Sequence, residues 1–598
     1  MNRLLLIILL LISNLAISQL SNKHWLPPLH ARDGSSFVGQ HLIYLSTPET
    51  TPFQVTVTDG AGVPITGSPF TISQGNPVSR TVGNGQPSVM FLNQSDVNIV
   101  KSDKGLIFQA SKEFYVSFKV KADFHAEMLV SKGKTGIGNA FRLGSLPQNF
   151  NGGIRNFVSS FMATEDNTNV TLSNYDPNVV FTSGAGDITD NFQNFTLNKG
   201  QSVVISGYTD VSANLQGFVG ALLTSDKPIA VSTGNATGGM LTQNDGQDFN
   251  LDQIVPVEKV GTEYIVVRGN GSDNSEYPLV IATQDNTQIF VNGNATPIAT
   301  LNAGNSLLVP NNNFQGTTSK NMYITSSKPI YLYQILAGSV SDATTGLNFI
   351  PPLSCFFQKS VDLIPFVDTI GGTNYSSDIF ALTTTGSTVS INGVNTTALP
   401  QAVSGNLNWV TYRIPNVTGN VVVSSTGPLA VGVFGFSGSA GFSGYYSGFG
   451  STPEDTDVII CTNSVVDLFD KINGNPETGG DWFFNGVPRV PNNGIFDANS
   501  DPIGLYTYSF TITCDGQSLT TDINVNVTTQ VGPNPGVSSS LNICNTDSLI
   551  DLSTLLGAGV TPGGSWTFNG TPRANSNLNP NTDLSGNYAY VIPSNDVC

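Results

Sequence analysis

The C-terminal part of the chain carries one cysteine–tryptophan–cysteine pattern twice, at a constant spacing. The two copies are Cys461, Trp482, Cys514 and Cys544, Trp566, Cys598, at offsets of 83, 84 and 84 residues. The residues around each tryptophan repeat as well, because GDWFFNG at 480–486 returns as GSWTFNG at 564–570. Self-similarity at a fixed period indicates an array of equal structural modules. We therefore expect two modules, over 458–530 and 541–598.

Each module has the size of an immunoglobulin-like (Ig-like) β-sandwich, in which a tryptophan packs beside a disulfide. The matching places of the cysteines predict two bridges in an oxidising compartment, Cys461–Cys514 and Cys544–Cys598. Closing loops of 53 and 54 residues would contribute about 4 kcal/mol each by the chain-entropy estimate. The alternative is reduced cysteines packed in β-cores. Cys355 has no counterpart in this pattern, so we expect it to be a buried thiol.

Both ends of the chain are informative. Residues 1–18 combine a basic start, nine consecutive aliphatic residues at 4–12 and small residues before Gln19. This pattern predicts a secretory signal peptide, too short for a membrane span, and a secreted or cell-surface protein.

At the C-terminal end, nothing follows Cys598 to match the strand-like 520–527 of the first module. We expect from this that the second module is truncated and that the chain is part of a longer modular protein.

Composition narrows the classes of partner. Charged residues make up only 11% of the chain, and the net charge is −18. A chain this acidic, without a basic run, binds polyanions poorly, so nucleic acid and anionic membrane surfaces are disfavoured as partners. With 39% hydrophobic residues in 598 positions, the chain has core material for several domains.

Residues 19–450 contain a second, more degenerate repeat. One signal is a turn, because ATEDNTN at 163–169 returns as ATQDNTQ at 282–288, with a weaker copy at 382–389. The other signal is a proline before a strand-like run. It occurs at Pro228, Pro329 and Pro428, which lie 101 and 99 residues apart, and 111–116 is a first copy without proline. We therefore expect about four units, each near 100 residues long.

Within a unit the pattern is that of β-structure. Short runs rich in β-branched and aromatic residues, such as 288–291 and 330–335, alternate with turn formers such as Asn292-Gly293. No stretch shows a helical apolar period. Five to seven strands per unit predict tandem β-sandwiches, with a β-propeller as the alternative. The predicted fold is all-β: a repeat-built N-terminal domain followed by Ig-like β-sandwich modules.

Several segments of 24–450 carry a family resemblance. They are HWLPPL at 24–29, IYLSTP at 43–48, the stretch 114–141 with SKGKTGIG at 131–138, then 163–168, 226–231 and FIPPLSC at 349–355. In this order they are similar to the N-terminal domain family named after the IgG Fc-binding protein of mucus, in the version found on surface proteins of Bacteroidota. The downstream modules resemble Ig-like domains of gliding-associated adhesins, which type IX secretion exports. The resemblance implies an adhesive surface protein and assigns no Fc-contact residue.

The sequence offers no catalytic constellation. All four histidines lie between residues 24 and 125, and no His-x-x-x-His or Cys-x-x-Cys pair supports a zinc site. The Gly/Ser-rich stretch 434–450 has no Gly-x-Ser-x-Gly elbow. Carboxylates of the repeated turns, such as Asp166 and Asp285, are expected to cap chain reversals rather than to form a glycosidase pair. We predict a non-enzymatic chain without a required cofactor.

Asp497, Asn499 and Asp501 alternate along the chain as oxygen ligands do in calcium loops. No glutamate closes a twelve-residue loop, so an ordinary Asx-rich turn is the favoured interpretation. Calcium between the modules is the alternative.

Four aromatic residues are interleaved with glycine near the end of the repeat region: Phe442, Tyr445, Tyr446 and Phe449. On an exposed loop such rings would stack on sugar faces or anchor a protein partner. The competing interpretation, which we favour, is a closing strand with rings in the core.

Together these patterns predict an extracellular or cell-surface adhesin that binds a glycoprotein, a polysaccharide or another surface partner, with a link to attachment or gliding. Two alternatives stay open. One is the targeting portion of a longer secreted enzyme, and the other is a structural protein of an extracellular matrix.

Overall fold

The protein is all-β, as predicted. The computed structural model describes residues 19–32, 38–152, 154–240, 247–337, 345–449, 452–472, 476–514 and 517–592, so the expected signal peptide lies outside the described residues. Helical structure within these ranges consists of short 3-10 turns: η2 (Gln94–Asp96), η3 (Gly133–Gly136), η4 (Ser212–Leu215), η5 (Val257–Lys259), η6 (Asn311–Asn313), η8 (Phe469–Lys471) and η9 (Leu552–Leu555). Among the residues described, no helix has the length and apolarity needed to cross a membrane.

Three successive units share one seven-stranded antiparallel design. The first unit comprises β1 (Ser21–Leu26), β2 (Gln40–Ser46), β3 (Phe53–Asp59), β4 (Phe70–Ile72), β5 (Val78–Asn84), β6 (Leu106–Lys121) and β7 (Ala126–Val130). The second comprises β8 (Ile137–Arg142), β9 (Asn156–Ala163), β10 (Thr168–Ser173), β11 (Gln193–Leu197), β12 (Ser202–Tyr208), β13 (Leu222–Gly238) and β14 (Asp248–Ile254). The third comprises β15 (Gly261–Val267), β16 (Tyr277–Ala282), β17 (Thr287–Val291), β18 (Ala299–Leu301), β19 (Ser306–Leu308), β20 (Asn321–Ala337) and β21 (Thr345–Phe349).

One long strand in each of these units, β6, β13 or β20, serves both layers of a β-sandwich. In β20, residues 321–326 pair with β15 and β17, whereas residues 330–337 pair with β16 and β21. Pro329 lies between the two ladders, and Pro228 takes the same place in β13. Because proline has no N–H, it is tolerated where the strand passes from one layer to the other. The proline signal read from the sequence therefore marks the bend of the long strand.

The fourth unit divides this long strand in two. Its strands are β22 (Ser360–Ile364), β23 (Thr369–Ile370), β24 (Thr373–Asn374), β25 (Ser376–Thr384), β26 (Val389–Ile391), β27 (Val394–Asn395), β28 (Gln401–Ala402), β29 (Trp409–Ile414), β30 (Val421–Ser425), β31 (Leu429–Ser437) and β32 (Ala440–Tyr445). β30 belongs to a four-stranded sheet and β31 to a five-stranded sheet. The break between them falls at Pro428, the third proline of the repeat.

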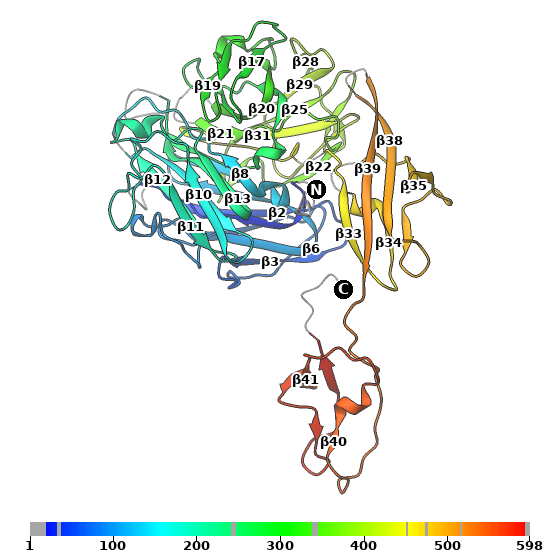
Figure 1. Ribbon diagram of the computed structural model, residues 1–598. Helices are drawn as coiled ribbons and strands as arrows, with labels where there is room; N and C mark the ends of the chain where they lie inside the picture. Colours follow the sequence, from blue (N-terminus) through cyan, green and yellow to red (C-terminus); the bar gives the residue numbers. More distant parts are fainter. Residues whose placement is uncertain are drawn as a thin grey trace, which may run out of the picture.

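The four units close into a ring through the last strand of each. β7 lies against β14 and β32, and β21 lies against β14 and β32 as well. The first and fourth units are therefore neighbours, although they are far apart in sequence. Figure 1 shows the resulting rounded body. Each unit is a sandwich rather than a propeller blade, so the tandem-sandwich prediction is confirmed.

The repeated turn signal has the structural role expected for it. Asn167 and Asn286 adopt left-handed backbone conformations, with φ of 53° and 56°. The preceding carboxylates bind the backbone of the neighbouring turn, since Asp166 Oδ1 accepts from Lys199 N at 2.9 Å and Asp285 Oδ1 accepts from Ala303 N at 3.0 Å. Asparagine tolerates this conformation better than most residues, which explains its place in these two copies, and the weaker third copy has Gly386 with φ of 87°.

The first Cys/Trp module, called module A below, has a complete sandwich core. Its strands are β33 (Thr456–Cys461), β34 (Val465–Asp467), β35 (Asp481–Phe484), β36 (Val487–Pro488), β37 (Ile495–Asp497), β38 (Gly504–Cys514) and β39 (Gln517–Gln530). The main sheet has the order β33-β39-β38-β35-β36, with β33 parallel to β39. Trp482 is 4% exposed and lies 5.0 Å from Tyr508, ring centre to ring centre, as a core plug.

Module A packs against the ring. The Phe356 and Phe510 rings lie 6.1 Å apart, and Lys359 Nζ lies 2.8 Å from Glu477 Oε1. Lys259 also pairs with Glu454, two residues before β33. Figure 1 shows module A beside the ring.

The second module, module B, lies apart from the ring in Figure 1 and has a smaller core. Its strands are β40 (Ile550–Asp551), β41 (Ser565–Phe568), β42 (Thr571–Arg573), β43 (Asn577–Leu578) and β44 (Tyr588–Val591). The buried apolar residues are Leu552, Trp566 and Leu578. Within the described part of module B, no strand corresponds to β33 or β39 of module A.

Candidate binding sites

The four aromatic residues named as ligand contacts are not on the surface. Phe442, Tyr445, Tyr446 and Phe449 are all 4% exposed or less. Phe449 stacks on Phe349, with ring centres 5.2 Å apart, and the Tyr446 hydroxyl lies 2.9 Å from Ser117 Oγ. The contact role is therefore wrong and the closing strand is correct, because β32 faces the last strands of the neighbouring units.

Buried carboxylates hold these last strands together. Glu127 of β7 accepts backbone N–H groups from two other units, Leu251 at 3.3 Å and Ser443 at 3.1 Å. Asp248 of β14 likewise accepts from Ala126 at 3.1 Å and Gly441 at 3.2 Å. Burial raises the pKa of both carboxyls well above the ordinary value. Each carboxyl thus joins three units at the centre of the ring.

A third buried carboxyl forms an ion pair with the lysine of the SKGKTGIG segment. Lys132 Nζ lies 3.2 Å from Asp252 Oδ1, and both side chains are at most 1% exposed. Asp252 Oδ2 also accepts Phe349 N at 3.0 Å, from the third unit. Lys132 Nζ stands 4.7 Å from the centre of the Phe449 ring. The segment that carried the resemblance is therefore part of the ring core.

The candidate calcium loop of module A is occupied by internal contacts. Asp501 Oδ2 binds Arg489 Nη2 at 2.7 Å and accepts Asp497 N at 2.9 Å, while Asp497 Oδ1 accepts Asn499 N at 2.9 Å. No group of three His, Cys, Asp or Glu suited to a metal ion occurs among the described residues. With Arg489 paired to Asp501, the loop has the internal contacts of the Asx-rich turn that the sequence favours.

Module B has the same arginine–aspartate ion pair, between Arg573 and Asp583, whose Nη2 and Oδ2 atoms are also 2.7 Å apart. Asn579 N donates to Asp583 Oδ2 at 2.8 Å. Neither arginine was expected to take part from the sequence. A signal was present, because Pro-Arg follows Phe-Asn-Gly-x in each module, ending at Arg489 and Arg573.

The cysteines do not pair as their spacing predicted. Cys544 is an exposed free cysteine, so the predicted bridge to Cys598, which lies outside the described residues, is wrong. Cys355 and Cys461 are disulfide-bonded, which also contradicts the thiol expected at Cys355.

The backbone register of module A argues against the predicted Cys461–Cys514 bridge. Cys461 pairs with Gln530 at one end of β39, and the Cys514 backbone pairs with Gln517 at the other end. At about 3.3 Å per residue these ends are about 40 Å apart. A disulfide requires Cα atoms within about 7 Å of each other.

A polar pocket of about 440 Å³ lies where the third and fourth units meet. Its lining residues are Arg268, Gly269, Asn270, Gly271, Asp273, Thr317, Thr318, Lys320 and Arg413. Arg268 and Arg413 come from opposite units, and both are largely buried. No sequence pattern indicates this pocket, because its cations are spread over 146 positions, from 268 to 413.

Carboxylates behind the pocket fix both guanidinium groups. Arg413 Nε donates to Asp378 Oδ2 at 2.8 Å, and its Nη1 donates to Gly269 O at 3.2 Å. Arg268 Nε lies 3.5 Å from Glu276 Oε2 and also pairs with Asp273. Burial raises the pKa of Glu276 to about 7, so this carboxyl is partly neutral near pH 7.

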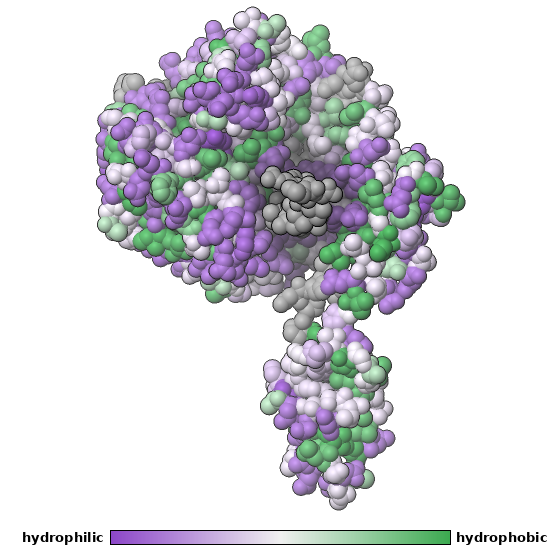
Figure 2. Space-filling model, viewed as in Figure 1, coloured by the Kyte–Doolittle hydropathy of each residue, from purple (hydrophilic) through white to green (hydrophobic). Residues whose placement is uncertain are grey.

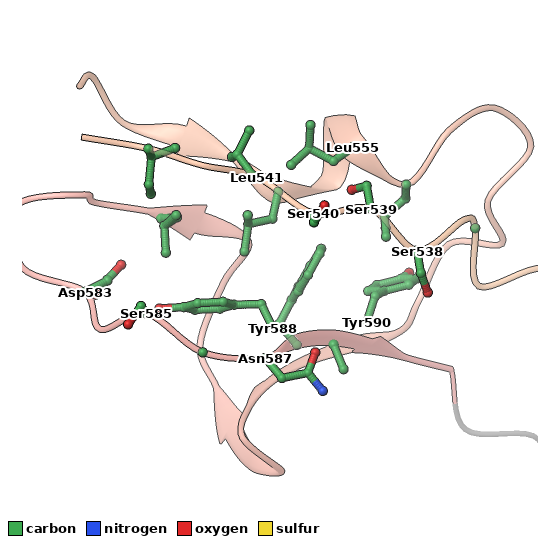
Figure 3. Close-up of a pocket in the computed structure, with 18 of the residues that line it drawn as sticks. Ser538, Ser539, Ser540, Leu541, Leu555, Asp583, Ser585, Asn587, Tyr588 and Tyr590 are labelled. Carbon is green, nitrogen blue, oxygen red and sulfur yellow. The ribbon is translucent and has the colours of Figure 1, made fainter. Parts of the chain in front are cut away.

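A larger cavity, of about 800 Å³, lies in module B (Figure 3). Apolar residues such as Leu541, Leu555, Tyr588 and Tyr590 point into it. Figure 2 shows hydrophobic residues gathered on the visible face of this module. In module A the equivalent space holds β39, whose Ile523, Val525 and Val527 are buried in the core. The cavity therefore corresponds to the place of a core strand.

Comparison with solved structures gives only distant likenesses. Solved structures that match include the N-terminal eight Ig domains of Down Syndrome Cell Adhesion Molecule, at 10% identity over 92% of this chain and 77% of that chain, with a TM-score of 0.13. Another is the α2-macroglobulin of Escherichia coli activated by porcine elastase, at 8% identity over 84% and 53%, with a TM-score of 0.12. At these TM-scores the likenesses carry no argument.

No curated protein matches the sequence. A family model described as IgGFc binding protein matches residues 126–435, which are 310 of the 598 residues and thus more than half of the chain. The matched range contains Glu127, Lys132, Asp248 and Asp252 of the ring centre. The chain belongs to the IgGFc-binding protein family.

Proposed function

We propose that this protein is a non-enzymatic extracellular adhesin that binds a glycoprotein, a polysaccharide or another surface partner. The observation that carries the proposal is the family match over 126–435, since the family is described by a binding activity. The hydrogen bonds of the buried carboxylates agree with this proposal. Glu127, Asp248 and Asp252 accept backbone hydrogen bonds between units, so they support a rigid scaffold.

The export and attachment context also belongs to the proposal. The pattern of residues 1–18 supports secretion, and the resemblance of the modules to gliding-associated adhesins supports type IX export and a role in attachment or gliding. In such a role, many copies on one surface would bind a repetitive partner through multivalency, even where each contact is weak.

A binding panel tests the proposal. The purified chain without residues 1–18 is passed over immobilised mucin, bacterial and algal polysaccharides and IgG Fc. Saturable binding to one class is the expected result, and it would identify the partner chemistry. A folded protein that binds none of these surfaces, or that hydrolyses one of them, would contradict a non-enzymatic adhesin.

A further inference from the structure

We propose that the polar pocket between the third and fourth units binds an anionic sugar, that is, a glycan unit bearing a carboxylate or a sulfate. This inference rests on the proposed binding function and deepens it by naming a site and a ligand class. The pocket volume, about 440 Å³, lies in the range of small-molecule sites, about 300–1,000 Å³.

The charge of the pocket has the opposite sign to that of the protein. Its lining holds three cations, Arg268, Lys320 and Arg413, and one carboxylate, Asp273. Asp378 pairs with Arg413 from behind, which gives 3 − 2 = +1 beside the partly neutral Glu276. The whole chain carries −18, with only 24 lysines and arginines. A cleft lined by one sign of charge concentrates ligands of the opposite sign. The local excess of cations therefore favours an anion.

Lys320 is the cation that remains available to a ligand. The residue is exposed at the end of the 315–320 segment, and its ammonium group has no ion-pair partner among the described residues. Arg268 and Arg413, by contrast, are held by Asp273, Glu276 and Asp378. Fixed guanidinium groups beside a free ammonium group form a preorganised anion site, which lowers the entropic cost of binding.

The rest of the lining suits a polyhydroxylated ligand. Thr317 and Thr318 are exposed at the pocket and carry hydroxyl groups, and Asn270 adds an amide. Gly269 and Gly271 contribute backbone to the lining, and a Cβ at either position would collide with Glu276 behind the pocket. Hydroxyl and amide groups around a charged residue are the combination that orients a small polar ligand. An acidic sugar offers both the anion and the hydroxyl groups.

The apolar cavity of module B is the strongest competing candidate. It lies where module A holds β39, so an incomplete core explains it without a ligand. The pocket at Lys320 has no such explanation, because the units on both sides of it have complete sheets.

Binding of three probes to the full chain and two matched variants tests the proposal. The probes are tetragalacturonic acid for the carboxylate, dextran sulfate for the sulfate and dextran as the neutral sugar. We expect one of the anionic probes to bind, dextran not to bind, and Lys320→Ala to weaken the anionic probe at least tenfold. Lys471→Ala, which removes an exposed lysine from module A, is the control and should have no effect. Unchanged thermal unfolding would show that both variants fold.

Each other outcome overturns the inference in a recognisable way. Equal weakening by Lys320→Ala and Lys471→Ala would indicate general charge attraction. Binding of dextran as strong as that of the acidic probes would exclude an anionic ligand. If the protein binds a surface of the larger panel but neither anionic probe, the adhesin proposal stands and the proposal of an anionic-sugar site is wrong. If nothing binds in either experiment, both proposals fail.

Discussion

The ring and the two modules are both built from tandem repeats, but the repeated carboxylates bind between units in the ring and within one unit in the modules. In the ring each unit has two neighbours, and buried carboxylates such as Asp248 accept hydrogen bonds from those neighbours. In the modules the repeated carboxylates stay within one unit, where Asp501 and Asp583 each bind an arginine of the same module. Closure turns a repeat into one cooperative body, whereas a linear array leaves each module to stabilise itself.

The pKa shifts follow the same division. Burial raises the pKa of Asp248 well above its ordinary value, while hydrogen bonds from Arg573 lower the pKa of Asp583. The carboxyl of Asp248 is desolvated between units, whereas the carboxyl of Asp583 forms an ion pair with Arg573 near the surface. Burial therefore decides the direction of the shift, and it also raises the pKa of Glu276, whose hydrogen-bond partners all lie within the third unit.

The largest effect is expected from removing a carboxyl shared between units. Asp248→Ala leaves the backbone N–H groups of Ala126 and Gly441 buried without an acceptor. Loss of such a network costs about 4 kcal/mol. Urea unfolding should show this loss, a smaller one for Asp248→Asn, and the smallest for Asp583→Ala. Equal losses for Asp248→Ala and Asp583→Ala would remove the distinction between ring and modules.

The ring should also lose stability as pH rises through the weakly acidic range. The folded pKa of Glu276 is about 7, above the value of 4.5 expected when unfolded. Between these values the unfolded chain releases the proton while the folded chain retains it, so stability falls as pH rises and levels off above 7. A shift of this size corresponds to at most about 3 kcal/mol.

Glu276→Gln isolates this contribution. The variant should show a flatter dependence of unfolding free energy on pH between 4.5 and 7 than the parent protein. Carboxyls elsewhere in the ring titrate in both proteins and cancel in the difference. A parallel dependence in the two proteins would show that Glu276 is ionised throughout this range.

The two tryptophans should respond unequally although their surroundings repeat. Trp482 contributes to a core completed by β39, and its truncation to alanine should cost about 3 kcal/mol. Trp566 is 9% exposed beside an open cavity, so Trp566→Ala should cost less. Differential scanning calorimetry would resolve the two transitions, because its signal does not depend on the tryptophan that each variant removes. A larger loss for Trp566→Ala would mean that module B carries the more complete core.

Local structure could be predicted from the sequence because its causes are local. A proline without N–H marks the bend of the long strand at Pro228 and Pro329, and asparagine marks the left-handed turns at Asn167 and Asn286. These features follow from properties of single residues. The all-β class and the sandwich units were accessible for the same reason.

The remaining features depend on contacts between distant parts of the chain. Tyr446 is buried because Ser117, 329 positions away, faces it across the closed ring. Lys320 and Arg413 share a pocket only because two units meet. The equal cysteine spacings were misleading, since the β38–β39 hairpin carries Cys514 to the end of the sheet opposite Cys461. No pattern along one strand encodes these distances.

The smallest expected effect concerns the attachment of module A to the ring. Cys355 and Cys461 are both disulfide-bonded, and Cys544 is free. Cys355 packs against the core of module A next to Phe356, whose ring contacts Phe510 of β38. Cys461 lies toward the far end of the same sheet, nine register positions beyond the Phe510–Thr521 pair on β39. A bridge from Cys355 to Cys461 would therefore have to span about 30 Å, which is too far.

We therefore expect Cys514, the last residue of β38, to be the partner of Cys355, so that one bond ties module A to the ring. Digestion under non-reducing conditions should release a peptide pair joining Cys355 to Cys514. Cys355→Ser should lower the unfolding free energy by about 2 kcal/mol, within the usual range for a disulfide, whereas Cys544→Ser should leave it unchanged. A recovered Cys461–Cys514 pair would restore the module-internal bridge and leave module A without the expected Cys355–Cys514 bond to the ring. The expected pair would instead show that module A belongs mechanically to the ring, and that the linear array begins only at module B.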